Sequence, residues 1–227
     1  MSGGARAYQD RKWAARAGTA IARPEPGSRV AVALDQLDGN GRLIDLGCGD
    51  GALLALAPGS GIGVDLSPAG LARMPAQIPR VCADLDAAHL PFRDASVETC
   101  TFLDALPYVE SPLRVLREVA RILKPGGRLI VSAPNARQFR HLLGLLAGKP
   151  IAPSPEERSY DGGQRHLFTD RSMAHLLDET GFACERLLGL LPAPRASFLR
   201  RMLGPIARGG IGRAMLAPGV LAIGRRR

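Results

Sequence analysis

Residues 43–51 read Leu43-Ile44-Asp45-Leu46-Gly47-Cys48-Gly49-Asp50-Gly51 and decide the fold of this chain. The first four residues are mostly apolar and predict a buried strand, and the three alternating glycines predict a tight loop after it. Glycine adopts left-handed turns and has no Cβ to keep a ligand away, while the start of the helix that follows offers unpaired N–H groups. The stretch therefore predicts a strand, loop and helix unit that binds a ligand with its backbone.

Asp45 separates this loop from the loops that bind dinucleotides. The pattern Gly47-x-Gly49-x-x-Ala52 also satisfies the dinucleotide fingerprint. A carboxylate at the end of the strand, however, repels a pyrophosphate and attracts a cationic group such as an ammonium. The loop is therefore expected to bind a zwitterionic nucleoside, and an NAD-dependent dehydrogenase is the disfavoured interpretation.

Two further acids end short apolar segments at a similar spacing along the chain. Residues 61–65 read Gly-Ile-Gly-Val-Asp, and residues 81–84 read Val-Cys-Ala-Asp. Because ligands of open α/β sheets bind outside the carboxyl ends of the strands, the three acids are expected to meet at one pocket. The carboxylate of Asp65 suits the two hydroxyls of a ribose, and that of Asp84 suits the exocyclic amine of an adenine.

These acids belong to a longer series of motifs. Residues 64–67 read Val-Asp-Leu-Ser, residues 84–85 read Asp-Leu, residues 90–92 read Leu-Pro-Phe, and residues 123–129 read Leu-Lys-Pro-Gly-Gly-Arg-Leu. In this order, the motifs between residues 40 and 185 resemble those of the class I S-adenosylmethionine (SAM) dependent methyltransferases. The resemblance is to the small-molecule, type 11-like subgroup of that family.

The resemblance implies an α/β fold with a Rossmann-like, doubly wound, seven-stranded and mostly parallel sheet, an N-terminal helical extension and a lid insertion. Strand-like and helical segments alternate along the chain, which favours the same sheet. Four regions are expected. These are residues 1–40 as an N-terminal helical cap, 41–132 as the SAM-binding core, 133–168 as a substrate lid, and 169–227 as the C-terminal part with a helix and the last strands.

The resemblance also implies SAM as the cofactor, S-adenosylhomocysteine as its product, and no metal. The glycine loop would bind the methionine end of SAM, Asp65 the ribose, and Leu66 one face of the adenine. Asp84 and the backbone of Leu85 would bind the adenine edge. The expected cofactor-binding residues are Asp45, Leu46, Gly47, Cys48, Gly49, Gly51, Asp65, Leu66, Asp84, Leu85 and Leu103.

The implied reaction is an in-line displacement at the SAM methyl carbon, in which positioning of the acceptor supplies much of the rate. An oxygen or nitrogen acceptor also needs a group that removes its proton. His166 leads the candidates because it lies where the lid returns to the core, and Tyr108 and Asp104 follow the fourth strand. A histidine in a lid also serves as a spacer, and Tyr108 stands where relatives often place histidine.

The net charge of +9 invites a nucleic-acid partner, because basic surfaces bind phosphates. Only three of the 30 basic residues are lysines, which is typical of a GC-rich coding sequence, and the 4% aromatic content is low for base stacking. Nucleic acid is therefore not expected as a partner. The arginines among apolar residues in the C-terminal third favour contact with an anionic membrane or an acidic substrate.

The preferred interpretation is a methyltransferase that acts on a small molecule, with lipid-like or quinone-like acceptors favoured. Two alternatives stay open, an enzyme that methylates RNA or protein and a catalytically degenerate SAM-binding regulatory module. No uncharged apolar run approaches the roughly 20 residues that span a bilayer, and residues 1–22 carry five charges. A cytoplasmic location is expected, and the oligomeric state is left open.

Overall fold

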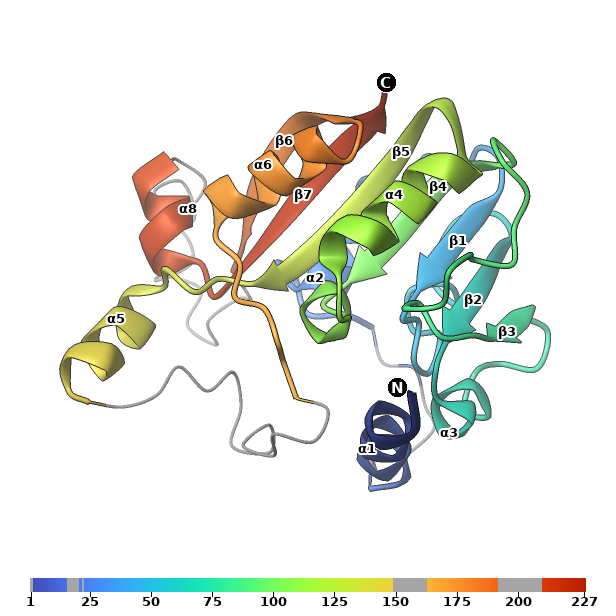
Figure 1. Cartoon of the computed structure of the whole chain (residues 1–227), viewed down its shortest axis with the longest axis horizontal. Helices are drawn as coiled ribbons and strands as arrows, with labels where there is room; N and C mark the ends of the chain where they lie inside the picture. The colour runs from blue at the N-terminus through green and yellow to red at the C-terminus, as the bar shows by residue number, and fades with distance from the viewer. Residues whose placement is uncertain (1, 16–20, 22, 149–162, 192–209) are drawn as a thin grey trace.

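The computed structural model describes residues 2–15, 21, 23–148, 163–191 and 210–227. In these ranges, seven strands form one sheet with the order β3-β2-β1-β4-β5-β7-β6 (Figure 1). The strands are β1 (Leu43–Leu46), β2 (Gly61–Asp65), β3 (Arg80–Cys82), β4 (Val97–Leu103), β5 (Leu123–Pro134), β6 (Phe182–Leu190) and β7 (Gly219–Arg226). β7 runs antiparallel to its neighbours β5 and β6, and the pairs among β1 to β5 are parallel. The predicted seven-stranded, mostly parallel sheet is confirmed.

Helices cover both faces of the sheet. They are α1 (Ser2–Ala14), α2 (Arg29–Leu34), α3 (Pro68–Leu71), the 3₁₀ helix η1 (Leu106–Tyr108), α4 (Pro112–Ile122), α5 (Phe139–Leu146), α6 (Asp170–Glu179) and α8 (Gly210–Leu216). Side chains of β5 alternate between the two faces of the sheet, and the core is divided into two clusters accordingly. Leu129 and Val131 pack with α4 and α6 on one face, and Ile130 packs with α2 on the other. The sheet is therefore doubly wound, as expected.

Local sequence sets where the main helices begin. Ser111 and Thr169 each accept a hydrogen bond from the backbone N–H three residues later, at the starts of α4 and α6. Pro112 follows Ser111 at the first helical position, where its missing N–H costs nothing. The apolar residues of α4, Val115, Leu116, Val119 and Ile122, are all buried against the sheet. Amphipathic spacing therefore fixes which face of α4 meets the strands.

Several elements differ from the expected boundaries. β3 ends at Cys82, so Asp84 lies in the loop beyond the strand rather than at its end. The insertion expected at 133–168 contains α5, and β5 extends into it as far as Pro134. A further helix, α8, precedes β7 in the C-terminal region. The four domain boundaries stay predictions. Part of the expected basic C-terminal surface, namely Arg195, Arg200, Arg201 and Arg208, lies outside the described residues.

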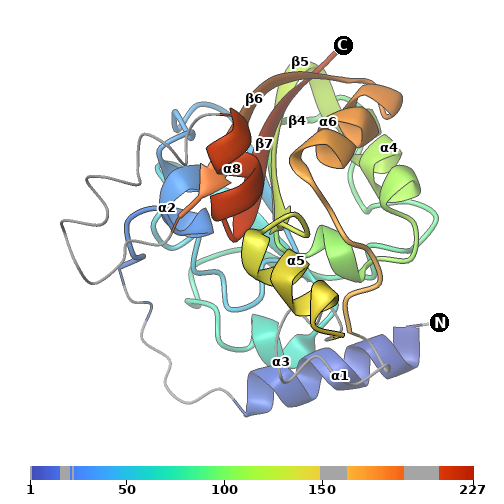
Figure 2. The same cartoon turned by 90° about the vertical axis from the view of Figure 1, so that its left-hand side faces the viewer.

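The carboxyl ends of β1, β2 and β4 share one edge of the sheet, and α1 lies across that edge beside α3 (Figures 1 and 2). α5 leaves the same edge after β5, on the other side of the molecule (Figure 1). No helix in the described ranges has both the length and the apolar character needed to cross a bilayer. The fold therefore gathers the loops of β1, β2 and β4 beneath an N-terminal helix.

Candidate functional site

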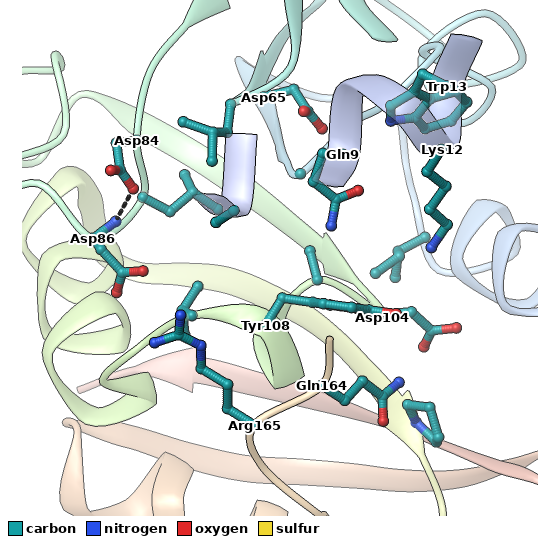
Figure 3. Close-up of a pocket in the computed structure, with 18 of the residues that line it drawn as sticks. Gln9, Lys12, Trp13, Asp65, Asp84, Asp86, Asp104, Tyr108, Gln164 and Arg165 are labelled. Atoms are coloured by element: carbon teal, nitrogen blue, oxygen red, sulfur yellow. Dashed lines mark hydrogen bonds between the residues drawn. The ribbon is translucent and has the colours of Figure 1, made fainter. Parts of the chain in front are cut away.

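A cavity of about 360 Å³ lies at this edge of the sheet (Figure 3). Its walls come from α1, α2, the loops after β1 to β5 and residues 164–165. The lining residues are Ala5, Gln9, Lys12, Trp13, Arg29, Gly47, Asp65, Leu66, Asp84, Leu85, Asp86, Leu103, Asp104, Ala105, Tyr108, Val109, Pro134, Gln164 and Arg165. Segments that are far apart in the sequence thus form the wall of one cavity.

The loop after β1 requires glycine at two positions. Gly47 has φ +68° and Gly49 has φ +55°, a backbone conformation that residues with a Cβ rarely adopt. A Cβ at Gly47 would collide with that of Ala105, and a Cβ at Gly49 would collide with the indole of Trp13. The loop therefore fits closely between β4 and α1, with Gly47 on the cavity wall.

Asp65 joins the glycine loop to the end of β2. One carboxylate oxygen accepts a hydrogen bond from the N–H of Gly49 at 2.8 Å, and the other accepts one from the N–H of Ser67 at 2.8 Å. Burial raises the pKa of Asp65, and the two backbone N–H donors oppose that effect. Each carboxylate oxygen has a second acceptor site. Asp65 therefore keeps the capacity to accept two hydroxyl groups from within the cavity.

Asp84 and Asp86 form the neighbouring wall. Asp84 accepts a hydrogen bond from the N–H of Asp86 at 2.9 Å, which closes a tight turn after β3. Both carboxylate oxygens of Asp86 lie within 3.0 Å of the N–H of Glu110, in the loop after η1. Burial raises the pKa of Asp86. The turn places the carboxylates of Asp84 and Asp86 on either side of Leu85 in the sequence. This part of the cavity wall therefore offers both polar and apolar groups.

Asp45 is not among the residues that line the cavity. It is buried within β1 and accepts a hydrogen bond from the hydroxyl of Thr101 at 2.6 Å. Burial raises the pKa of Asp45 to about 7, and the nearby carboxylate of Asp65 adds to the effect. The expected role of Asp45 in cofactor binding stays a prediction.

Asp104 lies across the cavity from Asp65, at the carboxyl end of β4. Its φ of +54° is unusual for a residue other than glycine, and such strain concentrates at functional sites. The Ser132 hydroxyl donates to one carboxylate oxygen at 2.7 Å, and Arg29 of α2 forms an ion pair with the other at 3.3 Å. The Asp104 side chain is therefore held in one orientation at the cavity wall.

Tyr108 and His166, the other two candidate bases, occupy different places. Tyr108 lines the cavity, and the Nζ of Lys12 lies 5.4 Å from the centroid of its ring. His166 is not among the lining residues, and its Nε2 lies 3.0 Å from the carbonyl oxygen of Val109. Since that oxygen only accepts, Nε2 is the donor. His166 therefore ties the segment before α6 to the loop after η1, and its role as a base stays a prediction.

Five of the expected cofactor-binding residues lie away from the cavity lining, and six lie on it. Those on the lining are Gly47, Asp65, Leu66, Asp84, Leu85 and Leu103, and those away from it are Asp45, Leu46, Cys48, Gly49 and Gly51. Cys48 is buried against Met74, and its carboxylate neighbours and burial raise its thiol pKa. The five residues away from the lining belong to β1 and to the loop that follows it.

The N-terminal helix supplies lining residues that the motifs did not identify. Gln9, Lys12 and Trp13 of α1 face Tyr108 and Arg165 across the cavity (Figure 3). Asp10, on the same helix, accepts hydrogen bonds from the Ser67 hydroxyl and from the N–H of Ala69. No sequence motif marks these side chains as part of the site. The sequence indicated them only in that residues 1–40 were expected to form a helical cap.

The charged side chains on the cavity wall fit a zwitterionic adenosyl ligand. Four carboxylates line the cavity, namely those of Asp65, Asp84, Asp86 and Asp104, and they face three cationic side chains, those of Lys12, Arg29 and Arg165. Carboxylates attract an ammonium or a sulfonium, and leucines beside them suit a purine ring. No group of His, Cys, Asp and Glu among the described residues is arranged to hold a metal ion.

Comparison with known proteins points to one family. Residues 44–131 match a family model described as a methyltransferase domain. A probable SAM-dependent methyltransferase of Mycobacterium tuberculosis is 29% identical over 157 residues, which cover 67% of this chain and 53% of that protein. The ubiquinone biosynthesis O-methyltransferase of Aeromonas salmonicida is 26% identical over 165 residues, 67% of each chain. The chain thus spans about half the length of the first of these relatives.

A solved structure agrees with these sequence matches. The SAM-dependent methyltransferase from Mesorhizobium loti superimposes with a TM-score of 0.62 at 25% identity, over 88% of this chain and 99% of that one. The match includes the seven-stranded sheet and therefore extends beyond residues 44–131. In its fold, its motifs and these relatives, the chain is similar to the class I SAM-dependent methyltransferases, and this similarity supports SAM as its cofactor.

Proposed function

We propose that this protein transfers a methyl group from SAM to a small-molecule acceptor. One observation carries the proposal, namely that a single cavity joins the glycine loop and Asp65 on one side to Asp104, Tyr108 and Arg165 on the other. The first group suits an adenosyl cofactor, and the second suits a polar acceptor. A site that bound the cofactor alone would not need the second group.

The cofactor-binding half of the cavity is assigned as follows. Asp65 accepts hydrogen bonds from both ribose hydroxyls, and Leu66 lies against one face of the adenine. Asp84 and the backbone of Leu85 recognise the adenine edge. Gly47 allows the methionine end of the cofactor to approach the backbone, since any side chain here would occupy that space. Asp45, Leu46, Cys48, Gly49 and Gly51, which complete β1 and its loop, stay part of the proposed cofactor-binding set.

The chain's contribution to the reaction is positioning and the exclusion of water. The cofactor supplies a methyl group already activated by the positive charge on its sulfonium. α1 covers the cavity with Gln9, Lys12 and Trp13, which limits the access of water. Holding the acceptor in line with that methyl group lowers the barrier by about 7 to 11 kcal/mol where the alignment is good.

Asp104 is the residue proposed to accept a proton, or a hydrogen bond, from a hydroxyl or amine acceptor. The Ser132 hydroxyl and Arg29 fix its carboxylate at the wall, and its oxygens keep further acceptor sites. Tyr108 is proposed to contact the acceptor from the η1 side, where Lys12 lies over its ring. His166 stays a second candidate for the base.

A quinone-like or lipid-like acceptor is favoured within this proposal. Val109 and Pro134 give the acceptor half of the cavity apolar surface next to its polar groups, while Leu103 keeps its expected place in the cofactor-binding half. The relative from Aeromonas salmonicida is named for ubiquinone biosynthesis. Both observations support a hydrophobic molecule that carries a hydroxyl or an activated carbon as the methyl acceptor.

An acceptor screen tests this function. The protein is incubated with SAM and with three classes of acceptor, namely demethylated quinols and phenols, bulk RNA, and a mixed protein substrate. S-adenosylhomocysteine release is expected with the first class and should be lost in Asp104→Asn when the acceptor is a phenol. Release with RNA or protein alone would overturn the choice of acceptor, and release with none would favour the regulatory module.

A further inference from the structure

Asp86 lines the cavity and has no role yet in the proposed function. It lies in the turn after β3, two residues beyond Asp84 (Figure 3). Its side chain is 17% exposed, and its carboxylate meets a segment that is distant in the sequence. The N–H of Glu110 donates to both carboxylate oxygens, at 2.9 and 3.0 Å. Asp86 therefore connects the turn after β3 to residues 107–110, called the acceptor wall below.

The groups around Asp86 explain why an acid occupies this position. Burial raises the pKa of Asp86, and the backbone N–H groups of Glu110 and Ser111 oppose that effect. These donors lie at the start of α4, and the N-terminus of a helix favours a negative charge. Arg114, in the first turn of α4, donates to the carbonyl oxygen of Asp86 at 2.7 Å. Because a carboxylate only accepts hydrogen bonds, it suits a place that faces N–H donors.

A second segment also holds the acceptor wall. The carbonyl oxygen of Pro107 accepts hydrogen bonds from the N–H of Arg165 at 2.8 Å and from that of His166 at 3.3 Å. The Arg165 guanidinium forms an ion pair with Glu110 at 3.4 Å. Residues 165–166 thus fix the acceptor wall to the segment before α6, while Asp86 fixes it to the proposed cofactor half of the cavity.

We propose that Asp86 is a positioning residue for the methyl acceptor. Its bond to Glu110 sets the separation between residues 84–87, assigned to the adenine, and Tyr108, assigned to the acceptor. The two ligands are thereby held at the separation that an in-line transfer needs. This inference rests on the proposed function, and Asp86 acts in it through Glu110 rather than by contact with either ligand.

The turn at residues 84–87 does not depend on the Asp86 side chain. Asp84 accepts the backbone N–H of Asp86 at 2.9 Å, and the Asp84 carbonyl oxygen accepts the N–H of Ala87 at 3.1 Å. Both bonds remain when the Asp86 carboxylate is removed. Asp86→Ala should therefore keep the adenine site and release the acceptor wall, and a misplacement of about 1 Å between reactants costs about 10²-fold in rate.

Calorimetry, kinetics and amide hydrogen exchange on the full chain test this inference. Asp86→Ala should bind S-adenosylhomocysteine as the unaltered chain does. With catechol as the acceptor, kcat per S-adenosylhomocysteine-binding site should fall by about 10- to 100-fold. Hydrogen exchange should become faster at residues 107–111, where the Glu110 amide is the donor, and stay unchanged at the glycine loop. Asp86→Asn keeps one acceptor oxygen, so its kcat should lie between the two.

Asp38→Ala is the matched control, because Asp38 accepts the N–H of Asn40 at 3.0 Å in an exposed turn and does not line the cavity. It should change neither kcat nor the exchange of residues 107–111.

Three results for Asp86→Ala would overturn the inference. Weaker S-adenosylhomocysteine binding would place Asp86 in contact with the cofactor, and faster exchange throughout the chain would give it a role in stability alone. An unchanged kcat, or unchanged exchange at residues 107–111, would show that it does not position the acceptor wall. If the unaltered chain methylates no phenol, the proposed function fails with this class of acceptor, and hydrogen exchange still decides whether Asp86 holds the wall.

Discussion

Asp65 is the side chain proposed to link the backbone of the glycine loop to the ribose of the cofactor. Its two oxygens hold the N–H groups of Gly49 and Ser67, and both oxygens retain acceptor sites toward the cavity. Asp65→Ala removes hydrogen bonds to a charged acceptor, which are each about 1.5–3 kcal/mol. Calorimetry should therefore show S-adenosylhomocysteine binding weakened by about tenfold or more.

Asp94→Ala is the control for this variant, because Asp94 is exposed and pairs with Arg121 away from the cavity. It should leave S-adenosylhomocysteine affinity unchanged. Unchanged affinity in Asp65→Ala as well would remove Asp65 from the ribose site, and the assignment of the cofactor half would fail with it.

Asp45 leads to a prediction about pH. Its folded-state pKa of about 7 lies above the usual value of 3.8, so the folded chain binds more protons than the unfolded chain between these values. Its contribution to stability is therefore present below about pH 4 and is lost as the pH rises toward 7. Asp45→Asn keeps an acceptor for Thr101 and removes the buried charge.

The free energy of unfolding of Asp45→Asn, measured in urea, should exceed that of the unaltered chain at pH 8. One pKa unit corresponds to about 1.4 kcal/mol, so the difference is bounded by about 4 kcal/mol. It should shrink toward zero as the pH falls to 4. A difference that stays constant with pH would show that burial of Asp45 does not penalise its charged form.

Asp104 was identified as a candidate from its place after the fourth strand, but its strained backbone and its two partners became visible only in the fold. Asp104→Asn should lower kcat with a phenolic acceptor by about 10²- to 10⁴-fold, the usual range for loss of a general base. Its affinity for S-adenosylhomocysteine should change little. A loss of affinity with unchanged kcat would place Asp104 in the cofactor half instead.

At the scale of elements, α1 is the part of the site that sequence motifs did not describe. It packs on α3, and Asp10 links it to Ser67 and Ala69 at the start of that helix. Trp13 lies on the glycine loop and is the single tryptophan of the chain. Its fluorescence therefore reports on ligand binding beside that loop.

Addition of S-adenosylhomocysteine should change the fluorescence of Trp13. In stopped-flow measurements, Asp10→Ala should release the ligand faster than the unaltered chain does, because the contact that holds α1 on α3 is gone. Arg6→Ala is a suitable comparison on the same helix, since the Arg6 guanidinium donates a hydrogen bond to the exposed Cys82 sulfur and not to the start of α3. Equal release rates in all three proteins would mean that α1 does not cover the bound ligand.

Motifs with a local physical cause could be predicted from the sequence. The glycines at 47 and 49 mark the loop because their backbone needs positive φ, and Ser111 and Thr169 mark helix starts because their hydroxyls cap N–H groups. The lining by Gln9 and Arg29 could not be predicted, because it depends on how distant segments pack. The hydrogen bond between Asp45 and Thr101 likewise could not be predicted, because it depends on the pairing of β1 with β4.

At the scale of the whole molecule, the sheet order explains why one cavity collects so many segments. β1 lies between β2 and β4, and the carboxyl ends of these three parallel strands open on the same edge. The connection that follows β4 places η1 at this edge, and α1, from before the first strand, and residues 164–165 complete the cavity wall. The same edge carries α5, so α5 and the proposed cofactor and acceptor halves of the cavity share one end of the molecule.

The central claim is that this cavity binds an adenosyl cofactor, and calorimetric titration with SAM, S-adenosylhomocysteine and NAD in one buffer tests it most directly. The carboxylates at the cavity predict micromolar binding of SAM and S-adenosylhomocysteine, and no binding of NAD, whose pyrophosphate they repel. Binding of NAD, or of none of the three ligands, would contradict the assignment.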